Sequence, residues 1–268
     1  MNDVVLLGCR GFVGSAFARH LSQQGISFLG VEAGNYGEGA GPCRLLIDAA
    51  GNSRKYLAEE DPLADFELTV SLVMRTLLDY PAEHFVLISS VDVYPNLDSP
   101  ESTREDTPID PLASSAYGFH KLMAELCVRR HARRWSIFRL AGMVGPGLRK
   151  NPVFDILHQA PLRIHPDSRY QYMHTDDVAS TVWQLIRDGA PGEIWNVCGE
   201  GLISPAEIAK LAGRRLDLSI LPSDSKPRVV DVNLAKTGGR IGLPSTVATI
   251  DGYVRQALSS RSRQGGQP

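Results

Sequence analysis

The chain has 268 residues, of which 43% are hydrophobic and 22% charged, and its formal net charge is -2. Such a balance is typical of an ordinary folded protein and excludes a general electrostatic attraction to nucleic acid or to an anionic membrane surface. A membrane-spanning helix is excluded too, because no apolar run approaches the roughly 20 residues that a bilayer requires.

Short apolar runs alternate with helical patterns along the chain, which predicts a parallel α/β sheet. The expected strands are residues 4–8, 27–32, 44–50, 84–90, 135–142 and 193–199. Helices are expected near 12–24, 62–79, 114–131 and 176–187, and one more begins at a capping box of Ser204 and Glu207. The connection from Glu32 to Arg44 is rich in glycine and too short for a full crossover helix.

Three glycines, Gly8, Gly11 and Gly14, follow the first expected strand at a spacing of three. By itself this pattern is weak evidence, because a tight turn between a strand and a helix explains it as well as a phosphate-binding loop does. The apolar strand before it and the amphipathic helical stripe after it favour the loop. Turn glycines let the backbone approach a pyrophosphate, and a helix N-terminus offers free N–H groups.

Glu32 ends the second expected strand, 18 residues after Gly14. A carboxylate there can accept hydrogen bonds from the ribose diol of a bound adenosine, although a solvent-facing loop acid is the alternative. Ala33 follows it, and no arginine stands beside it to receive a 2′-phosphate. The sequence therefore favours NAD over NADP.

Two polar motifs fall where chemistry is expected. Tyr117 and Lys121 are four residues apart, on one face of the expected helix, and a cation near the phenol would lower its pKa. Ser89 and Ser90 end the fourth expected strand, and ligands of open α/β sheets collect at the carboxyl ends of strands. The alternative for Tyr117 and Lys121 is an exposed pair on a helix, and the alternative for Ser89 and Ser90 is a helix or turn cap.

Together these motifs closely resemble the extended short-chain dehydrogenase/reductase family, specifically its NAD-dependent epimerase/dehydratase group, which acts mostly on sugar nucleotides. The resemblance runs from Val4 to about residue 245. No single element is specific, but their combination in this order is. The segments that carry it are GCRGFVG (8–14), LLIDAAG (45–51), ISSVDVY (88–94), PLASSAYGFHK (111–121), FRLAGMVGPG (138–147), YQYMHTDDVA (170–179) and IWNVCGEGLISPAEIAKLAG (194–213).

The resemblance implies a Rossmann-type doubly wound parallel sheet with a small C-terminal substrate-binding lobe. We expect one unit over residues 1–258. Its dinucleotide-binding core covers about 1–146 and 170–200, its substrate lobe covers about 147–169 and 201–250, and a disordered tail follows at 259–268. Relatives commonly form homodimers through two helices of each subunit, which correspond here to 65–79 and 114–131.

The resemblance also implies residue roles. Tyr117 is the general acid/base, Lys121 tunes the phenol and holds the nicotinamide ribose, and Ser90 hydrogen-bonds the reacting oxygen. The residues expected to bind NAD are Gly8, Gly11, Phe12, Val13, Gly14, Glu32, Ala49, Ala50, Tyr117, Lys121 and Gly142.

Several positions depart from the family pattern. Dehydratases of the family carry an Asp-Glu pair after the catalytic Thr, where this chain has Val91 and Asp92. Asp92 is either an acid/base or the cap of the following loop. Arg169 and Arg228 are candidates for a substrate phosphate clamp, or else surface residues.

No metal site is expected. His174, Asp176 and Asp177 are close in the sequence, but an N-cap at Thr175 followed by two acids in the first helical turn explains them without a metal. The four cysteines are dispersed and lack a CxxC pair, so we expect reduced thiols in a cytoplasmic protein.

The function expected from the resemblance is hydride transfer at C4 of a sugar nucleotide, by a 4-epimerase or a 4-ketoreductase. One alternative is a decarboxylase of a nucleotide-linked uronic acid, which would use Asp92. Another is a regulator that senses NAD without turnover, but such relatives usually lack the Tyr–Lys pair that this chain retains.

Overall fold

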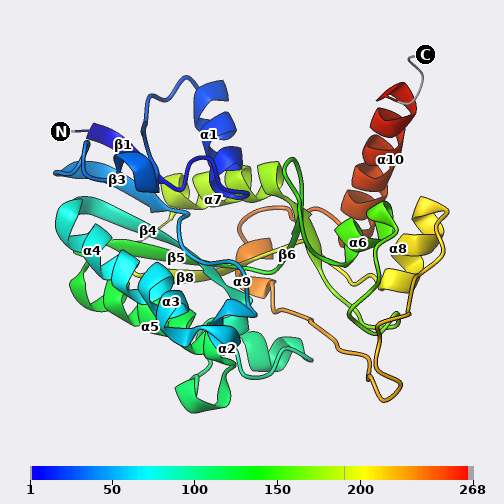
Figure 1. Cartoon of the computed structure of the whole chain (residues 1–268). Coiled ribbons are helices and arrows are strands. Elements are labelled where there is room, and N and C mark those ends of the chain that lie inside the picture. The colour runs from blue at the N-terminus through cyan, green and yellow to red at the C-terminus, as the bar shows by residue number, and fades with distance from the viewer. Residues whose placement is uncertain (1, 190, 265–268) are drawn as a thin grey trace.

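The structure, a computed structural model, describes residues 2–189 and 191–264. Its central element is a six-stranded parallel sheet in the order β2-β1-β3-β4-β5-β8 (Figure 1). All six expected strands form. Their bounds are β1 Asn2–Leu7, β2 Leu29–Val31, β3 Cys43–Asp48, β4 Ala82–Ser90, β5 Trp135–Leu140 and β8 Glu193–Val197.

Helices cover both faces of the sheet, which confirms the doubly wound Rossmann-type fold (Figure 1). On one face, Val4 and Leu6 of β1 pack with helices α1 (Gly14–Gln23) and α7 (Thr175–Asp188). On the other face, Val5 and Leu7 pack with α4 (Leu72–Asp79) and α5 (Ala116–His131). The near-continuous apolar run of β1 follows from this, because alternate side chains are buried on opposite faces.

The helix expected over 62–79 consists of three consecutive segments: α3 (Pro62–Phe66), a π-helical turn (Glu67–Ser71) and α4. The capping box of Ser204 and Glu207 begins α8 (Pro205–Ala212) as expected. The expected cap of α7 is wrong. His174 is the N-cap, because its Nδ1 accepts the N–H of Asp176 at 3.2 Å, and Thr175 is the first helical residue.

A separate apolar cluster joins β7 (Tyr172–His174), α6 (Pro152–His158), α8 and α10 (Thr246–Gln264) beside the main sheet (Figure 1). β7 pairs in parallel with β6 (Gly142–Val144). The short helices α2 (Leu57–Glu60) and α9 (Ala235–Gly238) complete the α-helices of the described residues. Further 3-10 turns lie at Val91–Val93, directly after β4, and at Pro100–Thr103 and Pro111–Ala113. α10 extends to Gln264, so the first part of the expected disordered tail lies within this helix, and residues 265–268 lie outside the described ones.

All four cysteines are free, and Cys43 and Cys198 are buried, as expected for reduced thiols. Across residues 2–189 and 191–264, no helix combines the length and apolarity needed to cross a membrane.

The order in which the strands are added to the sheet reverses at β1. The chain runs from β1 to β2 on one side and then returns to place β3 on the other side of β1. The returning connection contains only a 3-10 turn (Ala33–Asn35), which confirms that it is too short for a crossover helix. The two connections diverge at the carboxyl ends of β1 and β3, which is where an open α/β sheet is expected to form the crevice that binds ligands.

Gly14 lets α1 start directly against the end of β1. A Cβ at this position would lie 1.9 Å from the carbonyl oxygen of Gly8. We therefore predict that Gly14→Ala lowers the free energy of unfolding by about 1–3 kcal/mol or more, as for overpacked sites in general. Gly34→Ala is the control, because a Cβ there meets nothing within 4 Å. Urea denaturation of both variants tests this, and equal stability of the two would contradict the account.

Candidate active site

The glycine loop lies against the segment that follows β3. Gly8 has a φ of +71°, and a Cβ there would lie 2.8 Å from the carbonyl oxygen of Ala49 and 2.9 Å from the amide nitrogen of Ala50. The structure thus brings the two halves of the expected NAD site together at the crevice. Phe12 and Val13 are half-buried in the same loop, immediately before α1.

Glu32 is also held against this loop. Its carboxylate accepts the backbone N–H of Arg10 at 2.5 Å, and its own N–H donates to Oδ1 of Asn35 at 2.6 Å. A loop acid that simply faces solvent would lack such a contact. The carboxylate is therefore fixed next to the glycine loop.

Tyr117 and Lys121 are buried on one face of α5, as expected. The Tyr117 hydroxyl donates to the carbonyl oxygen of Asn52 at 3.3 Å. Lys121 Nζ lies 5.6 Å from the centre of the Tyr117 ring and 3.8 Å from the position of a Cβ at Gly51. The pair therefore faces the loop after β3, beside the crevice.

The pKa of Tyr117 departs from the expectation. Burial raises it above the ordinary value of a phenol, and the carboxylates of Asp92 and Asp65 raise it further. Burial also lowers the pKa of the Lys121 ammonium, against the opposing effect of nearby carboxylates. These carboxylates belong to Asp48, Asp65, Glu125 and Asp92. Burial and negative charges thus dominate at the phenol, and the net shift of its pKa is upward, not downward as expected.

Ser90 and Asp92 form a second polar group at the end of β4. The Ser90 hydroxyl donates to Oδ2 of Asp92 at 2.7 Å, and Lys55 Nζ donates to Oδ1 at 2.6 Å. Burial alone would raise the pKa of Asp92, but Lys55, Ser90 and Arg228 together hold it below its ordinary value. Asp92 is therefore ionised at neutral pH. It orients Ser90 and does not cap the following loop.

A cavity of about 360 Å³ lies beside Asp92. Arg228 belongs to its wall, whereas the charge of Arg169 acts on Glu207 at the start of α8. The backbone N–H of Arg169 donates to the backbone carbonyl oxygen of Arg228 at 2.7 Å. The lining residues are Asp92, Tyr94, Pro95, Asn96, Leu97, Asp98, Ser115, Pro227, Arg228 and Val229.

Gly142 lies in β6, where close packing leaves no room for a side chain. A Cβ there would meet the carbonyl oxygen of Gln171 at 2.5 Å and the ring of Tyr172 at 2.8 Å. At His174, where no metal is expected, Nδ1 of the ring accepts the backbone N–H of Asp176 as the N-cap of α7. Among the described residues, no group of three metal-ligating side chains is present.

Asp48 is a buried acid beside the glycine loop that the sequence analysis did not single out. It ends β3 and is 1% exposed, and its Oδ1 accepts the N–H of Ala50 at 3.1 Å. Its Oδ2 is buried without a hydrogen-bond partner among the described residues. Burial raises its pKa to about 6. An acid directly before the Ala49–Ala50 pair, at the end of an apolar strand, was the available signal.

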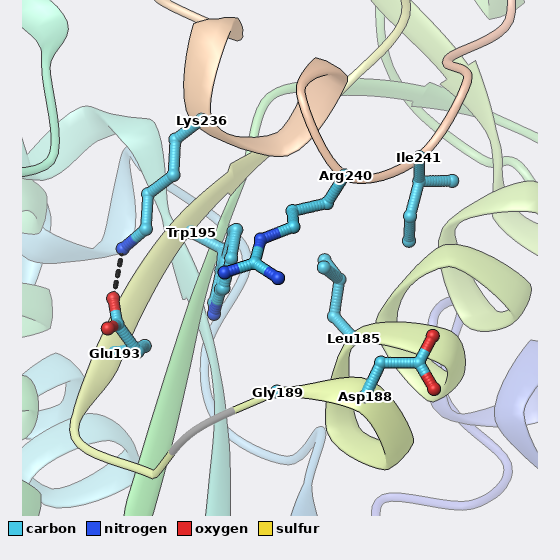
Figure 2. Close-up of a pocket in the computed structure, with 8 residues that line it drawn as sticks. All are labelled: Leu185, Asp188, Gly189, Glu193, Trp195, Lys236, Arg240 and Ile241. Carbon is cyan, nitrogen blue, oxygen red and sulfur yellow. Dashed lines mark hydrogen bonds and ion pairs between the residues drawn. The ribbon is translucent and has the colours of Figure 1, made fainter.

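A second cavity, of about 230 Å³, lies at the amino end of β8 (Figure 2). There Lys236 pairs with Glu193 and lies over the ring of Trp195, 4.3 Å from its centre. Asp188 and Gly189 at the end of α7 form another part of its wall. None of the expected site residues lines this cavity, and it faces away from the carboxyl ends of the strands.

The fold and the site define a dinucleotide-dependent α/β enzyme. The profile of the NAD dependent epimerase/dehydratase family matches residues 42–198, more than half of the chain, so the protein belongs to that family. No curated protein sequence matches the chain.

Solved structures share the fold over nearly the whole chain. A UDP-galactose 4-epimerase is 19% identical, with a TM-score of 0.76, over 97% of this chain and 99% of that one. A dTDP-glucose 4,6-dehydratase from Streptomyces venezuelae, with NAD bound, is 18% identical, with a TM-score of 0.77, over 97% and 98%. RMD from Pseudomonas aeruginosa, complexed with NADPH, is 20% identical, with a TM-score of 0.78, over 97% and 100%.

The buried Asp48 carboxyl predicts a pH-dependent stability. Its pKa is 3.8 when unperturbed and about 6 in the fold, so the folded state binds the proton more tightly. Stability from this group is therefore present below about pH 4 and is lost as the pH rises through 6, by about 3 kcal/mol.

Asp48→Asn should remove this loss, so the variant should gain stability relative to the wild type at pH 7.5 and not at pH 4. Urea denaturation at both values measures the difference. Asp106→Asn, at an exposed position, serves as the control. A gain that is the same at both pH values would contradict the assignment.

Proposed function

We propose that the protein is an NAD-dependent oxidoreductase that transfers hydride at C4 of the sugar in a sugar nucleotide, as a 4-epimerase or a 4-ketoreductase. The observation that carries this proposal is that Tyr117 and Lys121 face the loop after β3, beside the glycine loop, while Ser90 at the end of β4 contacts Asp92, whose charge acts on Tyr117. The names of the relatives agree with it, since they include a UDP-galactose 4-epimerase and an NAD-bound sugar-nucleotide dehydratase.

The site fits a dinucleotide. The close contact of Gly8 with Ala49 leaves backbone, and no side chain, at the crevice, and Asp48 Oδ2 is a buried acceptor without a partner among the described residues. The glycine loop, Ala49 and Ala50 would hold the pyrophosphate side, Glu32 the adenosine ribose, and Lys121 the nicotinamide ribose. When bound, NAD supplies hydride acceptance and donation.

Tyr117 handles the proton. Because burial and nearby carboxylates raise its pKa, the phenol keeps its proton at neutral pH and is ready to donate it to a carbonyl oxygen. The Ser90 hydroxyl donates its one proton to Oδ2 of Asp92 in the structure, and it would turn from Asp92 to donate to the same oxygen during reduction. Taking a proton from a hydroxyl, as an epimerase also must, requires the positive charge of Lys121 nearby.

The substrate enters the cavity beside Asp92, where Arg228 offers a cation to a diphosphate. Two alternatives are weaker. Elimination needs an acid at the position of Val91, and decarboxylation through Asp92 needs a proton donor, whereas Asp92 is held ionised. Hydride transfer at C4 needs neither group.

Tyr117→Phe tests the chemistry. We predict that it lowers turnover of the active sugar nucleotide by about 10²–10⁴-fold, the range for loss of a general acid/base. The affinity for NAD, measured by calorimetry, should stay unchanged. The assay uses 4-keto and 4-hydroxy sugar nucleotides with NAD or NADH, and Tyr56→Phe is the exposed control.

Dependence on added NADH with a 4-keto substrate identifies a ketoreductase, and interconversion without it identifies an epimerase. Full turnover by Tyr117→Phe would refute the catalytic role. Binding of NAD with no turnover of any member of the panel would favour the non-catalytic regulator.

We also propose a cytoplasmic homodimer that pairs through the helices 65–79 and 114–131, which lie side by side on one face of the sheet. Large apolar side chains stay exposed on these helices, including Leu68, Leu78 and Leu126. Burying them in a second copy would remove apolar surface from water.

Light scattering should therefore find a dimer for the wild type and a monomer for the double variant Leu68→Glu/Leu126→Glu. Leu211→Glu on α8 is the matched control, because Leu211 is 41% exposed and Leu68 is 42% exposed. A monomeric wild type, or a double variant that stays dimeric, would overturn the proposed interface.

A further inference from the structure

A buried polar network lies behind Tyr117 and takes no part in the roles given above. Asp65 of α3 is 0% exposed, and its Oδ2 lies 2.7 Å from Nδ1 of His120 on α5. Its Oδ1 accepts the side-chain amide of Asn52 at 2.7 Å and the Thr69 hydroxyl at 3.3 Å. The network thus joins two helices to the loop after β3.

Asn52 is fixed tightly by these contacts. Its amide group also donates to the carbonyl oxygen of Arg54 at 2.8 Å, and its Oδ1 accepts the N–H of Arg54 at 2.8 Å. Its backbone carbonyl is the acceptor of the Tyr117 hydroxyl. A carbonyl carries no proton to pass on, so this chain of contacts holds the phenol in place and is not a proton relay.

His120 stands between Tyr117 and Lys121 in the sequence of α5 and is enclosed by aromatic rings. Its ring meets Phe66 edge-on, with the centroids 5.6 Å apart, and lies 5.7 Å from Phe119. The imidazole is therefore held in one orientation, with Nδ1 toward Asp65. Whatever its protonation state, an Nδ1–H donated to the carboxylate weakens the negative field of Asp65 at its surroundings.

Charges face Tyr117 from each element packed around it. Asp65 belongs to α3, Asp92 to the 3-10 turn after β4, and Lys121 to α5 itself. Lys55 neutralises part of Asp92 from the loop after β3. The Asp65–His120 pair is thus one of two hydrogen-bonded arrangements around an acid that border the phenol, and it is the more deeply buried one.

We propose that Asp65 and His120 form a positioning pair for Tyr117, which anchors the Asn52 carbonyl against the phenol and sets the negative charge that the phenol experiences. The inference rests on the proposed function, because the placement of this phenol matters for catalysis only if Tyr117 is the acid/base. The pair acts on Tyr117 through the Asn52 carbonyl and through the negative charge of Asp65. Neither Asp65 nor His120 is assigned a contact with substrate.

Two substitutions separate the charge from the contacts. Asp65→Asn keeps a group that can accept from Asn52 and one that can meet His120, but it removes the negative charge. His120→Phe removes the donor to Asp65 and keeps an aromatic ring between Phe66 and Phe119. The two variants should shift the acidity of Tyr117 in opposite directions.

The test is ¹⁹F NMR of the full chain with difluorotyrosine in place of tyrosine, because fluorination brings the phenol titration into an accessible pH range. The signal that is missing in Tyr117→Phe assigns the residue. We expect Asp65→Asn to lower the titration midpoint of Tyr117 by about one pH unit, a shift of ordinary size for one neighbouring charge. His120→Phe should raise the midpoint, and the exposed Asp106→Asn should leave it unchanged.

A midpoint that does not move, or that rises, in Asp65→Asn overturns the proposal. If that variant does not fold, a midpoint that fails to rise in His120→Phe overturns it equally. The titration needs neither cofactor nor substrate. A protein with the expected shifts but without sugar-nucleotide turnover would therefore refute the proposed function alone.

Discussion

The close backbone contact of the glycine loop with the segment after β3 is the constraint on which the site depends. Gly14 allows α1 to begin against Gly8, and Gly8 in turn allows Ala49 and Ala50 to approach the loop. No side chain fits at either contact. Because the strand order reverses at β1, the connections that leave β1 and β3 diverge here, at the carboxyl ends where open α/β sheets bind ligands. Everything assigned to the cofactor follows from that arrangement.

The balance of charge around Lys121 is the second feature of the site. One buried ammonium is surrounded by four carboxylates, on β3, α3, α5 and the turn after β4. Glu125 is balanced separately, because Arg139 of β5 donates two hydrogen bonds to it and Ser89 donates a third. Ser89 thus has a structural role, whereas the hydroxyl of its neighbour Ser90 is the one proposed to contact the reacting oxygen. Burial and the carboxylates of Asp92 and Asp65 raise the pKa of the Tyr117 phenol, and the acids around Lys121 oppose the lowering of its pKa by burial.

Much of this could be predicted from the sequence. Apolar runs with turn signals located all six strands of the main sheet, because strands buried on both faces carry a strong local pattern. The order of the motifs predicted the candidate catalytic side chains, and the structure places Tyr117 and Lys121 together on one face of α5. The pKa of Tyr117 could not be predicted, since it depends on Asp65 and Asp92, which approach only through tertiary packing. The same holds for Asp48, whose effect arises from complete burial, and for His174, whose ring replaced the hydroxyl expected to cap α7.

The central claim is that NAD binds across the glycine loop and reaches the buried tyrosine and lysine. A crystal structure of the full chain with NAD tests it most directly. The account predicts the adenosine ribose within hydrogen-bond distance of the Glu32 carboxylate, the pyrophosphate at Gly11 to Gly14, and the nicotinamide ribose at Lys121. NAD bound elsewhere, for example in the cavity beside Trp195 and Arg240, would contradict it.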